Sequence, residues 1–268
     1  MPETTRTVAV NGGQFQIELR QGGNGPPLVY LHGAGGLRGW PVYLEELSKR
    51  FTVYAPLHPG WGQSTGMEHL DNDIRDLAFF YLDFLDAVGL ERAHFVGHSL
   101  GGMLALEIAA MDRSYVDKLI LVNSAGLWLD EAPIKDLFTT PLPELFPFIF
   151  HDPEGPVAKA YAPPEELKAA QEAYLIRYQS LGAAGKYLWP IPDHGTSRRL
   201  HRITAPTLIL WGESDGLIPL PYAEALRKGI KGARVEVLKE AAHMTLDEQP
   251  EKAVELITAF LNGKQNGK

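Results

Sequence analysis

The sequence contains no cysteine among its 268 residues. Disulfide bonds and thiolate metal sites are therefore excluded, and such a chain suits a reducing compartment. No apolar run approaches the roughly 18 residues of a membrane-spanning helix. The first residues, MPETTRTVAVNGGQ, lack the basic and apolar regions of a secretory signal. These absences predict a cytoplasmic protein that has no membrane partner.

Basic residues are outnumbered: 25 lysines and arginines stand against 33 aspartates and glutamates, which gives a net charge of −8. This balance argues against a nucleic-acid partner, because binding to a phosphate backbone favours an excess of positive charge. The chain is 45% hydrophobic and 22% charged, which excludes disorder, collagen and coiled coil. The length fits one large α/β domain, and the oligomeric state stays open.

Short apolar runs recur along the chain, and each is followed by a helical pattern. Such runs are typical of strands buried on both faces of a parallel sheet. The expected strands are Leu28–Leu31, Phe51–Ala55, His94–Val96, Leu119–Val122, Thr207–Trp211 and Val235–Leu238. Before them, Asn11-Gly12-Gly13 separates two alternating runs, Arg6–Val10 and Phe15–Arg20, which predicts a hairpin.

Two helical patterns are especially clear. After Asp71, apolar residues such as Ile74, Leu77 and Tyr81 recur at helical spacing, and the same spacing runs through Pro250–Leu261. Strands that alternate with helices predict an α/β fold with a mostly parallel sheet covered by helices on both faces.

The stretch from Gly126 to Leu200 breaks this alternation. It holds ten of the 20 prolines and one clear helical run, near Pro164–Leu181. Prolines in such number argue against central strands. The stretch is either a helical excursion that packs on the sheet or a cap over a site, and we favour the cap because long insertions in compact domains are usually functional.

The segment Gly97-His98-Ser99-Leu100-Gly101 matches the pattern G-x-S-x-G. An expected strand precedes it and a helical run follows it, which is the setting of a nucleophile elbow. Glycines at both ends allow the tight turn that exposes Ser99. The alternative is a glycine-rich turn whose serine only caps the helix.

A serine nucleophile needs a base to accept its proton, and His243 is the preferred candidate. It follows the last expected strand and precedes the last helix. The base in turn needs a carboxylate. Asp215 follows the strand Thr207–Trp211, at the end of the sheet where ligands gather. Glu213 and, less well placed, Asp247 are the alternatives. The chain order Ser99, Asp215, His243 is typical of one particular fold.

Acyl transfer also needs donors for an oxyanion. The run His32-Gly33-Ala34-Gly35-Gly36 follows the strand Leu28–Leu31, and its glycines let backbone amides approach a ligand. The predicted oxyanion hole consists of the backbone amides of Ala34 and Leu100. A phosphate-binding loop is the alternative, but no lysine follows at the required spacing.

Together these motifs resemble those of the α/β-hydrolase family. The resemblance extends over LHGAGG, HPGWGQS at 58–64, GHSLGG at 97–102, WGESDGLIP at 211–219 and AAHMTLDEQP at 241–250. It implies an eight-stranded sheet with a helical cap inserted after the sixth strand, and a catalytic triad of Ser99, Asp215 and His243. One departure is visible: members often carry an acidic residue just before the P-G-x-G-x-S turn, where this chain has Leu57-His58.

The resemblance divides the chain into a core, residues 1–125 and 201–264, and a cap, residues 126–200, with a frayed tail at 265–268. Residues expected near the substrate come from the loops and from the cap. These pocket candidates are His32, Gly33, His98, Trp128, Phe146 and Phe150.

The predicted function is a serine hydrolase that cleaves a small or medium carboxylic ester through an acyl-enzyme on Ser99. Neither a cofactor nor a metal ion is implied, because the histidines are too scattered for a ligand cluster. Two alternatives stay open. The same triad serves hydrolases of C–C bonds in ring-cleavage products. The other alternative is a module of this fold that binds a ligand without turning it over.

Overall fold

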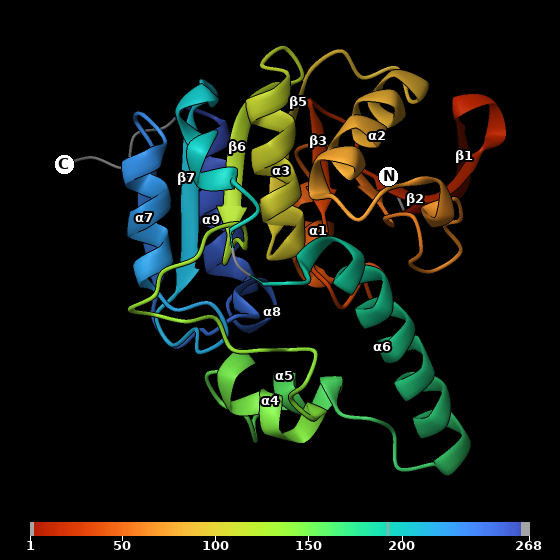
Figure 1. Ribbon diagram of the computed structural model, residues 1–268, viewed down its shortest axis with the longest axis vertical. Coiled ribbons are helices and arrows are strands. Elements are labelled where there is room, and N and C mark those ends of the chain that lie inside the picture. Colours follow the sequence, from red (N-terminus) through yellow and green to blue (C-terminus); the bar gives the residue numbers. More distant parts are fainter. Residues whose placement is uncertain (1–2, 192, 264–268) are drawn as a thin grey trace.

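An eight-stranded sheet forms the centre of the molecule in the computed structural model, which describes residues 3–191 and 193–263 (Figure 1). The strand order is β1-β2-β4-β3-β5-β6-β7-β8. The strands are β1 (Thr4–Val10), β2 (Phe15–Gly22), β3 (Pro27–Leu31), β4 (Thr52–Pro56), β5 (Ala93–His98), β6 (Val116–Val122), β7 (Thr207–Gly212) and β8 (Arg234–Leu238). The tail predicted at 265–268 lies outside the described residues.

The sheet is parallel from β4 across to β8, whereas β1 and β2 are antiparallel to their neighbours. The predicted hairpin is present, and its ends pair Val10 with Phe15. Every residue of β5 and of β7 is buried, as expected for strands covered on both faces. The predicted mostly parallel α/β sheet is confirmed.

Helices cover both faces of the sheet. Asp73 caps α2 by accepting a hydrogen bond from the amide of Arg75, and the predicted helix Pro250–Leu261 is α9. None of the helices in the described ranges combines the length and the apolar character that crossing a bilayer requires. The helices are α1 (Val42–Ser48), α2 (Ile74–Ala87), α3 (Leu100–Met111), α4 (Leu142–Ile149), α5 (Pro156–Tyr161), α6 (Leu167–Leu188), α7 (Pro221–Gly229), α8 (Thr245–Glu248) and α9 (Pro250–Leu261), with short 3₁₀ turns at 11–13, 67–69, 196–198 and 200–202.

The segment 126–200 contributes α4, α5 and α6, which lie beyond the carboxyl ends of β6 and β7 (Figure 1). Helix α6 extends the predicted helical run to Leu188. The sequence did not predict α4 and α5, because prolines obscure them. Proline is compatible with the first turn of a helix, where Pro143 and Pro156 lie. The division into core and cap domains stays a prediction.

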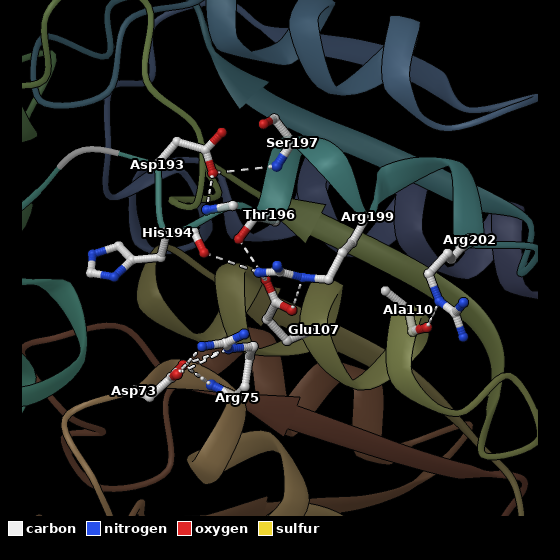
Figure 2. A network of polar contacts seen from close by, with 11 residues as sticks. Asp73, Arg75, Glu107, Ala110, Asp193, His194, Thr196, Ser197, Arg199 and Arg202 are labelled. Carbon is white, nitrogen blue, oxygen red and sulfur yellow. Dashed lines mark hydrogen bonds and ion pairs between the residues drawn. The ribbon is translucent and has the colours of Figure 1, made fainter.

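A buried carboxylate ties the end of this segment to α3. Glu107, which is 1% exposed, accepts two hydrogen bonds of 2.8 Å from the guanidinium of Arg199 and another from the hydroxyl of Thr196 (Figure 2). Such bidentate pairing compensates the cost of burying the charge. The start of the segment lies close by, since a Cβ added at Gly126 would be 3.5 Å from Thr196 Cγ2.

Candidate active site

The parallel strands present their carboxyl ends at one edge of the sheet, and the candidate catalytic side chains all lie there. Ser99 follows β5, Asp215 lies in the loop after β7, and His243 lies in the loop after β8. All three side chains are buried, with exposures of 7%, 5% and 4%. The loop 32–41, which follows β3, lies at the same edge.

Ser99 occupies a strained turn between β5 and α3. Its φ of 55° and ψ of −116° lie in a region that side-chain-bearing residues rarely adopt. The glycines around it are required by close contacts. A Cβ on Gly97 would be 2.3 Å from the carbonyl oxygen of Gly101, and a Cβ on Gly101 would be 2.0 Å from that of Leu31. Backbone atoms at these distances cannot move aside, so the tight turn requires both glycines. Ser99, which the sequence predicted to be exposed, is buried at 7% exposure.

Asp215 is held by four hydrogen bonds. Its Oδ2 accepts from His243 Nδ1 at 2.9 Å and from Asn123 Nδ2 at 2.7 Å, and its Oδ1 accepts from the amides of Leu217 and Ile218 at 2.9 Å each. Donors on both oxygens fix the carboxylate toward the imidazole. This arrangement holds the proton of His243 on Nδ1 and leaves Nε2 as the acceptor nitrogen of the neutral ring.

The alternative carboxylates do not make this contact. Glu213 is exposed, and Asp247, one turn beyond His243, interacts with Tyr161 instead. Sequence reasoning missed Asn123, which follows β6 directly. A polar side chain immediately after a buried strand was the available signal, because the carboxyl ends of neighbouring parallel strands meet.

His98 contacts the backbone of His243. Its Nε2–H donates to the backbone carbonyl of His243 at 2.9 Å. Burial, and then the neighbouring His243, lower the pKa of His98 to about 3. His98 is therefore neutral at physiological pH, and its hydrogen bond holds the loop that carries His243.

A second histidine pair supports the loop after β3. The backbone amide of His58 donates to His32 Nε2 at 3.1 Å, and His58 Nε2–H donates to the carbonyl of His32 at 3.0 Å. Burial lowers the pKa of His58 to about 4 and the pKa of His32 well below its usual value. Trp61 adds a hydrogen bond of 3.0 Å from its indole to the carbonyl of Ala34. Neutral His58 thus anchors this loop at the point where the sequence departs from the usual family pattern.

The two predicted oxyanion donors belong to the residue after Ser99 and to the loop after β3. Leu100 is the first residue of α3, where amides have no helical carbonyl partner. Ala34 follows Gly33, and a Cβ added to Gly33 would be 3.2 Å from Ser99 Cβ. The loop after β3 therefore lies close to Ser99.

A cavity of about 790 Å³ opens above Ser99 and His243. Most of its wall is apolar, and about half of the lining residues come from the segment 126–200. Of the pocket candidates, Gly33, His98 and Phe146 line it. Other lining residues include Met103, Ile134, Leu137, Leu142, Leu145, Ile149, Leu181 and Leu188.

The other three pocket candidates do not line the cavity. The imidazole of His32 is occupied by its contacts with His58, and the indole of Trp128 donates to Asp130 Oδ1 at 2.8 Å. Phe150 is 2% exposed and packs against Phe146 and Tyr161. Each of these side chains is directed to a protein partner, which sequence spacing alone did not predict.

Comparison with known proteins places the chain in a broad group of hydrolases. A model described as the alpha/beta hydrolase family matches residues 28–256. A 2-hydroxy-6-oxo-6-phenylhexa-2,4-dienoate hydrolase of Comamonas testosteroni is 28% identical over 92% of this chain and 91% of its own.

Two solved structures share the architecture. A bacterial membrane phospholipase A superposes with a TM-score of 0.80 at 25% identity and covers 99% of this chain and 87% of its own. The naproxen esterase of Bacillus subtilis superposes with a TM-score of 0.75 at 20% identity, over 97% of this chain and 92% of its own, a likeness of fold.

Proposed function

This chain belongs to the alpha/beta hydrolase family, and on that premise we propose that it is a serine hydrolase that cleaves a small or medium carboxylic ester. The observation that carries the proposal is the hydrogen bond of 2.9 Å between His243 and Asp215 beside a serine held on a strained turn. Such a buried pair has the features of a base and its orienting acid.

The proposed reaction proceeds through an acyl-enzyme. Ser99 Oγ attacks the ester carbonyl while His243 Nε2 accepts the hydroxyl proton, and the amides of Ala34 and Leu100 stabilise the oxyanion. His243 then gives the proton to the departing alkoxide, which leaves as the alcohol. Water then attacks the acyl-enzyme carbonyl while His243 accepts a proton from it. His243 returns that proton to Ser99 Oγ as the acid is released. Asp215 stays ionised throughout and stabilises the imidazolium.

The cavity supports an ester with an apolar acyl or alcohol part. Its volume of about 790 Å³ lies within the range of small-molecule sites, and its walls are mainly aliphatic and aromatic. The phospholipase A named among the similar structures is, by that name, an ester hydrolase. A substrate seated under α4 and α6 would be shielded from water, which strengthens the electrostatic stabilisation of the oxyanion.

Hydrolysis of a C–C bond in a vinylogous diketone acid is a second candidate, favoured by the 28% identity to the dienoate hydrolase. The two candidates differ in the substrate and share the triad. A C–C hydrolase should turn over such an acid with a kcat/KM far above its value for simple esters. The reverse ratio would identify an esterase.

Labelling with a fluorophosphonate tests the proposal without a guessed substrate. The intact protein should be modified stoichiometrically at Ser99, as located by peptide mass spectrometry, and Ser99→Ala should not be labelled. An ester screen then follows, in which Ser99→Ala should have a kcat lower by about 10⁴ or more. Absence of labelling in folded protein would contradict an activated serine and favour a module that binds a ligand without turnover.

A further inference from the structure

Three arginines line the same cavity as Ser99: Arg20, Arg38 and Arg177. Arg38 comes from the loop after β3, and Arg177 comes from α6 in the segment 126–200. Arg38 Nη1 donates to the carbonyl of Ala160 at 3.2 Å, and its guanidinium lies 4.6 Å from the ring centre of Tyr161. Arg38 therefore bridges the core and α5 while its remaining donors stay available to the cavity.

Arg177 has no carboxylate partner within the described part of the chain. Arg20, on the same cavity wall, differs because its guanidinium is paired with Glu18. Arg177 is half-buried, and burial together with the nearby charge of Arg38 lowers its pKa. Arg38 and Arg177 therefore place two positive charges on the wall of one cavity, in a chain whose net charge is −8.

We propose that Arg38 and Arg177 form a subsite for an oxyanionic group of the substrate, a carboxylate or a phosphate, on a part of the molecule other than the scissile ester. Guanidinium groups present several donors in a planar fork that matches both kinds of oxyanion. The anion would replace the mutual repulsion of the two cations by attraction. The inference rests on the proposed ester hydrolysis and specifies its substrate class.

The rest of the cavity indicates the shape of such a substrate. Aliphatic and aromatic side chains, among them Leu137, Leu145 and Phe146, line the same cavity. A half-ester of a dicarboxylic acid, or an ester that bears a phosphate on an apolar chain, would satisfy both environments. The apolar chain would occupy the hydrophobic wall, and the anion would contact the two arginines.

Asp247 is the carboxylate that lines this cavity in the described structure. The charge of Arg38 acts on it, and Tyr30, Tyr43, Tyr161 and Glu248 also interact with it. A negative charge here opposes an anionic ligand. Its removal should therefore strengthen anion binding, opposite in sign to the removal of an arginine.

The kinetic test compares matched substrates. The p-nitrophenyl half-esters of dicarboxylic acids of four to ten carbons are measured beside the neutral diesters in which the free carboxylate is methylated. A further substrate, p-nitrophenyl 6-phosphonooxyhexanoate, tests phosphate. The measured quantity is the ratio of kcat/KM for the anionic ester to kcat/KM for the neutral one. Arg177→Gln should lower this ratio about tenfold or more, as loss of a charge-assisted hydrogen bond would. Arg177→Lys should retain part of it.

Two further variants test the sign of the charge effect and its dependence on a position in the cavity. Asp247→Asn should raise the ratio. Lys168→Gln removes one positive charge from an exposed position on the same helix, outside the cavity, and should leave the ratio unchanged. An equal fall of the ratio in Arg177→Gln and Lys168→Gln would overturn the subsite, because it would reflect net charge alone.

A binding measurement keeps the inference testable if no ester is turned over, an outcome that would contradict the proposed function instead. In Ser99→Ala, calorimetry should show that monomethyl adipate binds more tightly than dimethyl adipate, and that adding Arg177→Gln removes the difference. The phosphate pair is methyl 6-phosphonooxyhexanoate and methyl 6-hydroxyhexanoate. Equal binding within both pairs of compounds would overturn the subsite. Discrimination in the phosphate pair alone would identify phosphate as the anion.

Discussion

The carboxyl edge of the sheet and the segment 126–200 face the same cavity but are built differently. At the edge, Ser99 and His243 are buried. The backbone there leaves no room for an added atom, since a Cβ on Gly101 would lie 2.0 Å from the carbonyl oxygen of Leu31. In α6, by contrast, Leu175, Ile176 and Tyr178 are 58%, 62% and 65% exposed. The edge therefore constrains residue identity through the backbone, whereas α6 tolerates many side chains. Small changes should therefore be costly at the edge and mild in α6.

The largest effect is expected from a single-atom change at the edge. Asp215→Asn replaces an acceptor by an amide at the hydrogen bond to His243, so the imidazole loses the partner that fixes its tautomer. We expect kcat to fall about 10⁴-fold with the fold retained. Steady-state kinetics and circular dichroism measure the two quantities. Glu213→Gln, the same change on an exposed neighbour, is the control, and a greater loss there would mean that Glu213 is the acid.

A methyl group added at the edge tests the backbone constraint directly. In Gly101→Ala the new Cβ would lie 2.0 Å from the carbonyl oxygen of Leu31, so β3 and α3 would have to separate. We expect the free energy of unfolding to fall by more than about 3 kcal/mol. Urea denaturation measures it. A loss below about 1 kcal/mol would contradict the constraint, because the edge would then adapt as readily as α6.

The buried histidine behind the edge should make stability depend on pH. The folded-state pKa of His58 is about 4, against 6.5 for the unconstrained side chain. Between these values the unfolded chain binds the extra proton, so stability falls as pH drops from 6.5 toward 4, and His58 alone accounts for about 3 kcal/mol of the loss. His32 and His98, whose pKa values are also lowered, add to it. Urea denaturation at several pH values measures the slope.

His58→Gln should reduce that slope, and His201→Gln, at an exposed position, should leave it unchanged. If His58→Gln does not fold, the imidazole resonance of the unsubstituted protein gives the pKa directly. A His58 pKa near 6.5 would contradict the expectation.

The smallest effect, with the opposite sign, is expected in α6. Gly182 lies inside this helix, and a Cβ added there would meet no atom within 4 Å. Gly182→Ala should raise the free energy of unfolding by about 0.5–1 kcal/mol, because alanine restricts the unfolded chain and suits a helix. Thermal and urea denaturation measure the change. Destabilisation would show that α6 is as constrained as the edge.

The same contrast explains what the sequence predicted. The sheet followed from buried apolar runs, and Ser99, Asp215 and His243 followed from their positions directly after three of those runs. Asn123 was missed because its role depends on a contact with Asp215 across 92 positions of sequence. Helices α4 and α5 were missed because proline counts do not reveal which prolines occupy first turns. Arg38 and Arg177 carry no local signal, since only folding brings the loop after β3 to α6.

The adjacency of Gly126 and Thr196 beside α3 has an evolutionary consequence. The segment between them leaves and returns to the core at almost one point, and Glu107 fastens the returning end. Segments of other lengths and sequences are therefore interchangeable there, provided that their two ends keep this spacing, because neither end displaces a strand. Recombination at this junction would change the walls of the cavity and leave Ser99, Asp215 and His243 in place.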